Sequence, residues 1–119
     1  MDGIYQAGKI LASRLDNPPS VEELAQQVGL NRLKLNHGFH HVYGTTPFRY
    51  LRNCRLAQAR LLLTDSMLSV EDIAYRVGYT SRSRFATAFC QLFGLNPKTL
   101  QRYSRLTSQH RSRQKSLAS

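Results

Sequence analysis

The chain reads Ser20-Val-Glu-Glu-Leu-Ala-Gln-Gln-Val-Gly29 and later repeats this segment as Ser69-Val-Glu-Asp-Ile-Ala-Tyr-Arg-Val-Gly78. Seven of the ten positions match when Leu and Ile are counted as equivalent, and a Glu/Asp pair makes an eighth. After one residue inserted in the second copy, the similarity continues as far as Pro47 and Pro97. An internal repeat of this kind predicts a repeated supersecondary structure.

Each copy carries the signals of two short helices joined by a tight turn. The opening serine and the acid three residues later form a capping signature, and the closing glycine ends the helix. Beyond the turn, Asn31 in the first copy and Thr80-Ser81 in the second can cap another helix. This order is the layout of a helix-turn-helix motif. Gly38 interrupts the second helix of the first copy, which we attribute to close packing near the core.

The sequence around the repeats predicts further helices. An opening helix runs from about Ile4 to Leu15, a long linker from Pro47 to about Leu63, and a last helix from Pro97 to about Arg105. We therefore expect an all-α fold of about seven helices, in which two helix-turn-helix subdomains are joined by a long linker helix buried by both. The expected divisions are residues 1–52 for the first subdomain, 47–63 for the shared linker, 64–107 for the second subdomain, and 108–119 for a basic, disordered tail.

The charge of the chain indicates a polyanionic partner. Seventeen Lys and Arg residues against seven Asp and Glu give a formal charge of +10, and no acidic residue follows Asp72. No apolar run approaches the roughly 18 residues of a membrane span, and Met1–Ile10 lacks the layout of a secretory signal, so we expect a cytoplasmic protein without a membrane partner.

Helical geometry separates an inner from an outer face on the second helix of each copy. In the first copy, Leu35, Phe39 and Val42 point inward. The opposite face holds Leu33, His37 and His40, with Asn36 at its margin. In the second copy, the inner residues are Phe85, Phe89 and Leu92. The outer side holds Ser83, Thr87 and Cys90, flanked by Arg84 and Ala86, with Arg82 in the first turn.

These side chains suit DNA recognition, and each also has a simpler explanation. Arginine can bind guanine, asparagine can bind adenine, and Leu33 can meet a thymine methyl. An isolated surface leucine is also common, and arginine more often contacts phosphate or water. His37, His40 and His41 lack a local carboxylate or thiol partner, and Cys54 and Cys90 have no metal-binding spacing. We therefore expect no metal, no disulfide and no cofactor.

The residues resemble the AraC/XylS family of bacterial transcription regulators over roughly residues 4–105. In the first helix-turn-helix unit, the residues that match the family are Gly29-Leu30-Asn31, Leu35, Phe39, Gly44 and Pro47. In the linker they are Arg55-Leu56, Ala59 and Leu62-Leu63. The matching residues of the second unit are more specific to the family: Ile73-Ala74, Gly78-Tyr79, Ser83, Phe85, Phe89, Phe93-Gly94 and Asn96-Pro97. The sequence from Gly29 to Phe39 also resembles the siderophore-responsive branch of the family, typified by the pyochelin regulator.

The resemblance implies double-stranded DNA as the partner and assigns roles to individual residues. The base-contacting set it implies is Leu33, Asn36, His37, Arg82, Ser83, Ala86 and Thr87. We expect the backbone or flanking set to be Asn31, Arg32, His40, Arg49, Arg84 and Lys98. His37 and Thr87 stand where the family often has arginine, and Cys90 where a phosphate-binding lysine is usual, so readout there is expected to differ.

The resemblance also implies RNA polymerase as a partner, and an effector bound by an N-terminal domain. Asp2-Gly3-Ile4 looks like the continuation of a preceding domain, so we expect an excised C-terminal domain of a bacterial regulator.

Three other classes of protein compete with this interpretation. A nonspecific or architectural nucleic-acid binder would use the same charge with a steep salt dependence. A protein-interaction module would keep its function without the Arg82 and Arg84 charges. An enzyme is not expected, because no paired carboxylates, activated nucleophile or phosphate-cradling glycine loop is visible.

Overall fold

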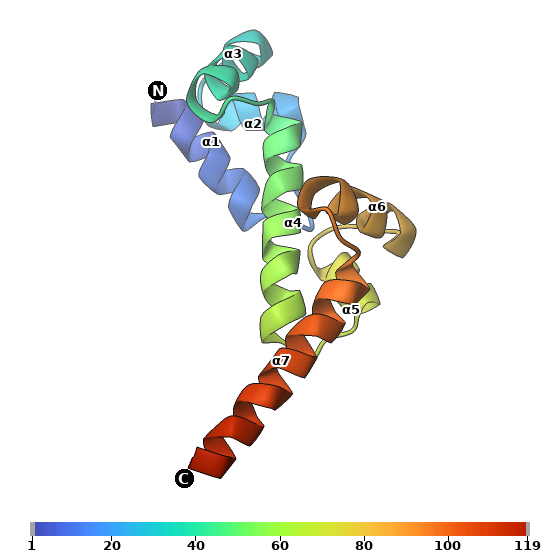
Figure 1. The fold of residues 1–119 in the computed structure, drawn as a ribbon. Helices are drawn as coiled ribbons and strands as arrows, with labels where there is room; N and C mark the ends of the chain where they lie inside the picture. The colour runs from blue at the N-terminus through green and yellow to red at the C-terminus, as the bar shows by residue number, and fades with distance from the viewer. Residues whose placement is uncertain (1, 119) are drawn as a thin grey trace. The chain divides into compact units, whose positions relative to one another are not determined.

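The computed structural model describes residues 2–118, with side chains through residue 108. The described chain forms seven helices and no strand (Figure 1), which confirms the predicted all-α class. The helices are α1 (Asp2–Ser13), α2 (Val21–Gln27), α3 (Arg32–Tyr43), α4 (Pro47–Asp65), α5 (Val70–Arg76), α6 (Arg82–Phe93) and α7 (Pro97–Ala118).

The helices of the repeat begin where the sequence predicted. Ser20 and Ser69 each accept a hydrogen bond from the backbone N–H three residues on, at 3.1 Å, and so satisfy an otherwise unpaired donor. Asn31 does the same for α3 at 2.8 Å. In the second copy the cap is Ser81 rather than Thr80. Gly29 follows α2 with a φ of 72°, a left-handed conformation that side-chain-bearing residues rarely adopt.

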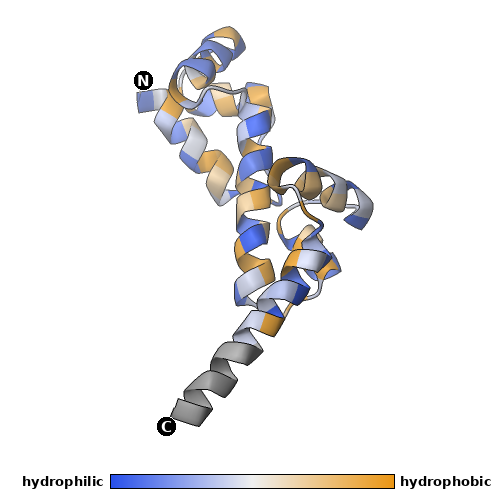
Figure 2. Ribbon diagram, viewed as in Figure 1, coloured by the Kyte–Doolittle hydropathy of each residue, from blue (hydrophilic) through white to orange (hydrophobic). Residues whose placement is uncertain are grey.

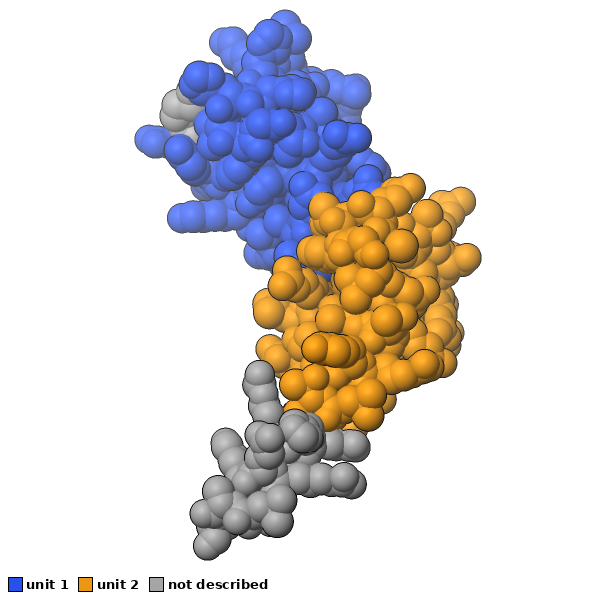
Figure 3. Space-filling view, in the orientation of Figure 1, with its two compact units in different colours: residues 1–57 blue, residues 58–119 orange. Residues whose placement is uncertain are grey.

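The chain divides into two compact units, residues 1–57 and 58–119 (Figure 3). In the first unit, α1, α2 and α3 pack on one another and on the first part of α4. The buried core draws on all four helices and consists of Ile4, Ala7, Leu11, Leu24, Ala25, Leu35, Phe39 and Leu51.

An aromatic cluster joins α3 to α4 within this unit. The Tyr50 ring lies 4.5 Å from that of Tyr43 and 5.5 Å from that of Phe39, measured between centroids. Burial, together with the neighbouring Cys54 and Tyr43, raises the pKa of Tyr50 to about 12. Burial also raises the pKa of the Cys54 thiol. These groups therefore remain protonated near neutral pH and act in packing.

The second unit has a separate core, in which α5 packs on α6 and α6 on α7. Val70, Ile73, Ala74 and Val77 are buried with Phe85 and Phe89. The prediction that Leu92 points inward was wrong, because its side chain is 45% exposed. Phe93 packs against Phe89 instead, with ring centroids 4.7 Å apart.

The long helix α4 supplies buried residues on both sides of the division at residue 57. Leu51 and Leu56 are buried in its first part, and Ala59 and Leu63 in its second. Leu61 is 55% exposed, so not every apolar residue of the linker is covered. In the first unit, Arg55 donates from Nε to the Leu15 carbonyl at 2.8 Å, which ties α4 to the segment after α1.

Helix α7 is held to the end of α4 and the following loop by polar contacts. Gln101 is 7% exposed and donates to the Leu68 carbonyl at 2.7 Å. Ser104 and Arg105 donate to the carbonyls of Thr64 and Met67, both at 3.4 Å. The helix continues to Ala118, past the end predicted near Arg105, because no Gly or Pro interrupts that stretch. The disorder predicted for 108–119 concerns a segment whose side chains, from residue 109 on, lie outside the described structure.

The helices are amphipathic, with hydrophilic and hydrophobic residues along each one (Figure 2). Within the described residues, none of them combines the length and apolar character needed to cross a membrane.

Candidate nucleic-acid interface

Helix α3 presents the first of the two predicted recognition faces. It buries Leu35 and Phe39 and, on the opposite side, leaves Leu33 67% exposed. His37 and His40 are also exposed, and Asn36 is partly so. The predicted orientation of this helix is therefore observed. An exposed leucine between amide and imidazole groups offers both apolar and hydrogen-bonding contacts to a base edge.

Helix α6 presents the second face. Phe85 and Phe89 are fully buried, whereas Arg82, Ser83, Arg84 and Thr87 are exposed and Ala86 is partly exposed. The Thr87 hydroxyl donates to the Ser83 carbonyl at 3.0 Å. Its proton is therefore in use, and the oxygen lone pairs and the methyl group remain to meet a partner.

The predicted backbone-contacting cations Arg49 and Lys98 lie at the start of the helix that follows each recognition helix. Both side chains are exposed. Thr46 caps α4 by accepting from the Arg49 N–H at 3.2 Å, and Asn96 accepts from the Lys98 N–H at 2.9 Å. These caps hold the backbone beneath each cation in a defined position.

Arg32 forms a contact that the sequence predictions did not include. Its Nη1 donates to Glu22 Oε1 at 2.9 Å, across the turn between α2 and α3. Both side chains are largely exposed, at 65% and 62%. The signal was present in the sequence, since Glu22 is the third residue of the first repeat and Arg32 follows the predicted cap Asn31.

The histidines of α3 do not assemble into a metal site. Within the described residues, no three His, Cys, Asp or Glu side chains are placed to hold an ion. Cys54 is partly buried and Cys90 is exposed on α6, and both are free thiols.

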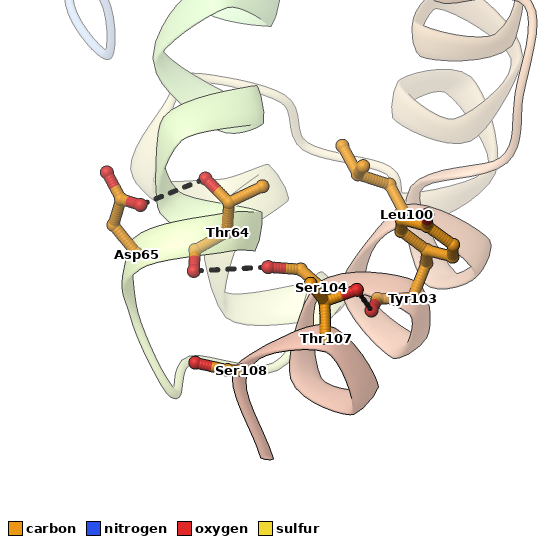
Figure 4. Close-up of a pocket in the computed structure, with 7 residues that line it drawn as sticks. All are labelled: Thr64, Asp65, Leu100, Tyr103, Ser104, Thr107 and Ser108. Carbon is orange, nitrogen blue, oxygen red and sulfur yellow. Dashed lines mark hydrogen bonds between the residues drawn. The ribbon is translucent and has the colours of Figure 1, made fainter. Parts of the chain in front are cut away.

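A surface cleft of about 410 Å³ lies between the end of α4 and α7 in the second unit (Figure 4). It is lined by Thr64, Asp65, Leu100, Tyr103, Ser104, Thr107 and Ser108. The hydroxyls of Ser104 and Thr107 donate to backbone carbonyls, and that of Thr64 contacts Asp65 at 3.1 Å. Of these contacts, the bond from Ser104 to the Thr64 carbonyl joins α7 to α4, and the other two lie within a single helix.

Two capped recognition helices with exposed polar and basic faces define a helix-turn-helix DNA-binding domain. A family model described as a helix-turn-helix domain matches residues 24–103. The chain belongs to the AraC family of transcription regulators. The named relatives are transcription regulators, in agreement with the class of protein that the sequence resemblance implied.

The curated relatives are regulators with different names. The chain is 39% identical over 83 residues to the transcriptional regulator AlkR of Acinetobacter baylyi, a match covering 70% of this chain and 27% of AlkR. It is 38% identical over 79 residues to the transcriptional activator RhaS of Escherichia coli, covering 66% and 28%. The regulatory protein PchR of Pseudomonas aeruginosa is 39% identical over 70 residues, covering 59% and 24%.

The match therefore spans about a quarter of the length of these relatives. Because the three identities are almost equal, they do not single out one branch of the family, and the siderophore-responsive branch stays a prediction.

Solved structures show the same fold. An AraC-type regulator from Chromobacterium violaceum superposes with a TM-score of 0.82 at 25% identity, covering 87% of this chain and 92% of that chain. The DNA-binding domain of AdpA, solved in complex with a target DNA, also gives 0.82 at 25% identity, covering 90% and 96%.

Proposed function

We propose that α3 and α6 are the recognition helices of a bipartite DNA reader and enter successive major grooves of one duplex. The observation that carries the proposal is that each unit builds the same element, a capped helix with two buried residues on one side and an exposed polar face on the other. The AdpA domain, which has this fold, was solved on a target DNA.

The two helices would contribute unequally to readout. The bases would be contacted by Leu33, Asn36 and His37 of α3, and by Arg82, Ser83, Ala86 and Thr87 of α6. Asn31, Arg32, His40, Arg49, Arg84 and Lys98 would contact the backbone or flank the reading surface. The proposed base-contacting residues of α6 include one exposed arginine, Arg82, whereas those of α3 are a leucine, an amide and an imidazole. The half-site read by α6 should therefore be richer in guanine.

Selection of bound sequences from random duplex tests this function. We expect two short motifs about 10 bp apart, without palindromic symmetry, since the two units of one chain differ in sequence. A single short motif would mean that only one of the two units recognises a base sequence.

The strong positive charge supports one rival, sequence-independent binding. In that case selection would enrich no motif, and the selected and random duplexes would bind with equal affinity.

We further propose that the protein acts in the bacterial cytoplasm at the nucleoid, that DNA-bound protein contacts RNA polymerase, and that any effector binds outside this segment. The extension of the relatives well beyond the matched part supports the last point. A transcription assay with this chain alone, on a template carrying the selected site, should give polymerase-dependent activation that small effectors leave unchanged.

A further inference from the structure

The two repeats have a glutamate and an arginine at equivalent positions, but these residues form an ion pair in the first unit only. Glu22 and Glu71 are the second residues of α2 and α5, and Arg32 and Arg82 are the first residues of α3 and α6. In the first unit the two side chains form an ion pair at 2.9 Å. In the second unit, where both are described, no ion pair joins Glu71 to Arg82.

The turns between the two helices also differ between the units. Residues 28–31 separate α2 from α3, whereas residues 77–81 separate α5 from α6, one residue more. The cap backbones differ accordingly: ψ is 168° at Asn31 and 125° at Ser81, and φ is −90° and −137°. The second unit thus combines a longer turn and a different cap backbone with an Arg82 side chain that forms no ion pair with Glu71.

We propose that Glu22 is a positioning residue that withholds Arg32 from DNA phosphates, while Arg82 is left available to the duplex. The inference rests on the proposed function of α3 and α6. The Glu22 carboxylate engages the Nη1 donor of Arg32 and offsets the charge of the guanidinium. Because the carboxylate also repels a phosphate that approaches the remaining N–H groups, Glu22 competes with the DNA backbone for Arg32. Because phosphate contacts carry no sequence information, this competition limits the affinity of the first unit for any duplex.

The expected effect is modest. Exposed ion pairs contribute little, so the competition should reduce affinity by no more than about fivefold. A DNA phosphate can displace Glu22 from such a weak ion pair, so Arg32 can still contact DNA, at a reduced affinity.

The test compares Glu22→Gln with Glu71→Gln. Both changes remove one carboxylate from the second position of a seven-residue helix, and both leave the capping serine in place. Affinities for random and selected duplexes are measured over a range of salt concentrations. We expect Glu22→Gln to tighten binding to both duplexes by about threefold more than Glu71→Gln. It should also steepen the slope of log K against log salt by about one unit, as expected for one additional phosphate contact.

A double variant decides between competition for Arg32 and a general effect of charge. In the Arg32→Gln background, the additional gain from Glu22→Gln should disappear. Equal gains from the two glutamate variants, or a gain that persists without Arg32, would overturn the proposal. Failure of the proposed function would be recognised separately, because the unmodified chain would then bind selected and random duplexes with equal affinity. Thermal unfolding of each variant verifies that the helices remain folded.

Discussion

Gly38 of α3 lies directly against Ile4 of α1. A Cβ atom at position 38 would sit 2.5 Å from Ile4 Cγ1 and closer still to its Cδ1. Ile4 is itself 3% exposed within the core, so its stiff, branched side chain has little room to move. This contact confirms the interpretation of the helical glycine as a site of close packing.

Replacing Gly38 by alanine should therefore destabilise the first unit by about 1–3 kcal/mol, despite the higher helix propensity of alanine. Urea unfolding of Gly38→Ala, Ile4→Ala and the double variant measures the coupling. The overlap predicts that Gly38→Ala costs little once Ile4 is truncated. An equally large cost in both backgrounds would show that the clash is not with Ile4.

Tyr50 should make stability fall at high pH. Its pKa is raised from 10.0 to about 12 in the folded chain, so the folded state holds the proton more tightly than the unfolded state does. The stabilisation is complete below pH 10 and is lost as the pH rises toward 12. Unfolding midpoints from pH 9 to 12 should fall more steeply for the unmodified chain than for Tyr50→Phe. Parallel curves would contradict this assignment.

Gln101 should contribute more to the stability of the second unit than Ser104. Gln101→Ala leaves the partly buried Leu68 carbonyl without its donor, which costs about 1–3 kcal/mol. Ser104 makes a longer and more exposed bond of 3.4 Å, so Ser104→Ala should change the unfolding free energy by less than about 0.5 kcal/mol. A comparable loss in both variants would mean that burial does not set the strength of this contact.

Arg82 and Lys98 should separate base readout from backbone contact. Arg82→Ala is expected to cost about 1–3 kcal/mol on the selected site and much less on random duplex, whereas Lys98→Ala should weaken both equally and reduce the salt slope by about one. Titration of each variant against the two duplexes distinguishes them. If Arg82→Ala weakens both duplexes alike, Arg82 is a phosphate contact.

Leu33 should act through apolar contact. Since it is 67% exposed, Leu33→Ala should leave the unfolding temperature nearly unchanged but weaken binding to the selected duplex. Replacing thymine by uracil removes the methyl group that a leucine can touch. We expect at least one such replacement to weaken DNA binding by the unmodified chain and to leave DNA binding by the Leu33→Ala variant unchanged. Equal sensitivity of both proteins at every thymine would argue against a methyl contact.

The sequence by itself determined the elements that depend on neighbours along the chain. Ser20, Asn31 and Ser69 cap helices because a side-chain oxygen bonds an N–H only three residues away, and helical periodicity places Leu33 opposite Leu35. The repeat of these local signals was enough to predict two helix-turn-helix units and about seven helices, and the resemblance of the same residues to known regulators indicated the family.

Tertiary structure decided the contacts that depend on how separate helices meet. These include the exposure of Leu92, the pairing of Glu22 with Arg32 and the absence of an equivalent Glu71–Arg82 pair among the described residues. The turn of the second copy is one residue longer, yet Phe85 and Phe89 are buried like Leu35 and Phe39 of the first copy. Position along the sequence therefore identified the residues of the candidate interface, but only packing in space decided which of its charges are already engaged by the protein.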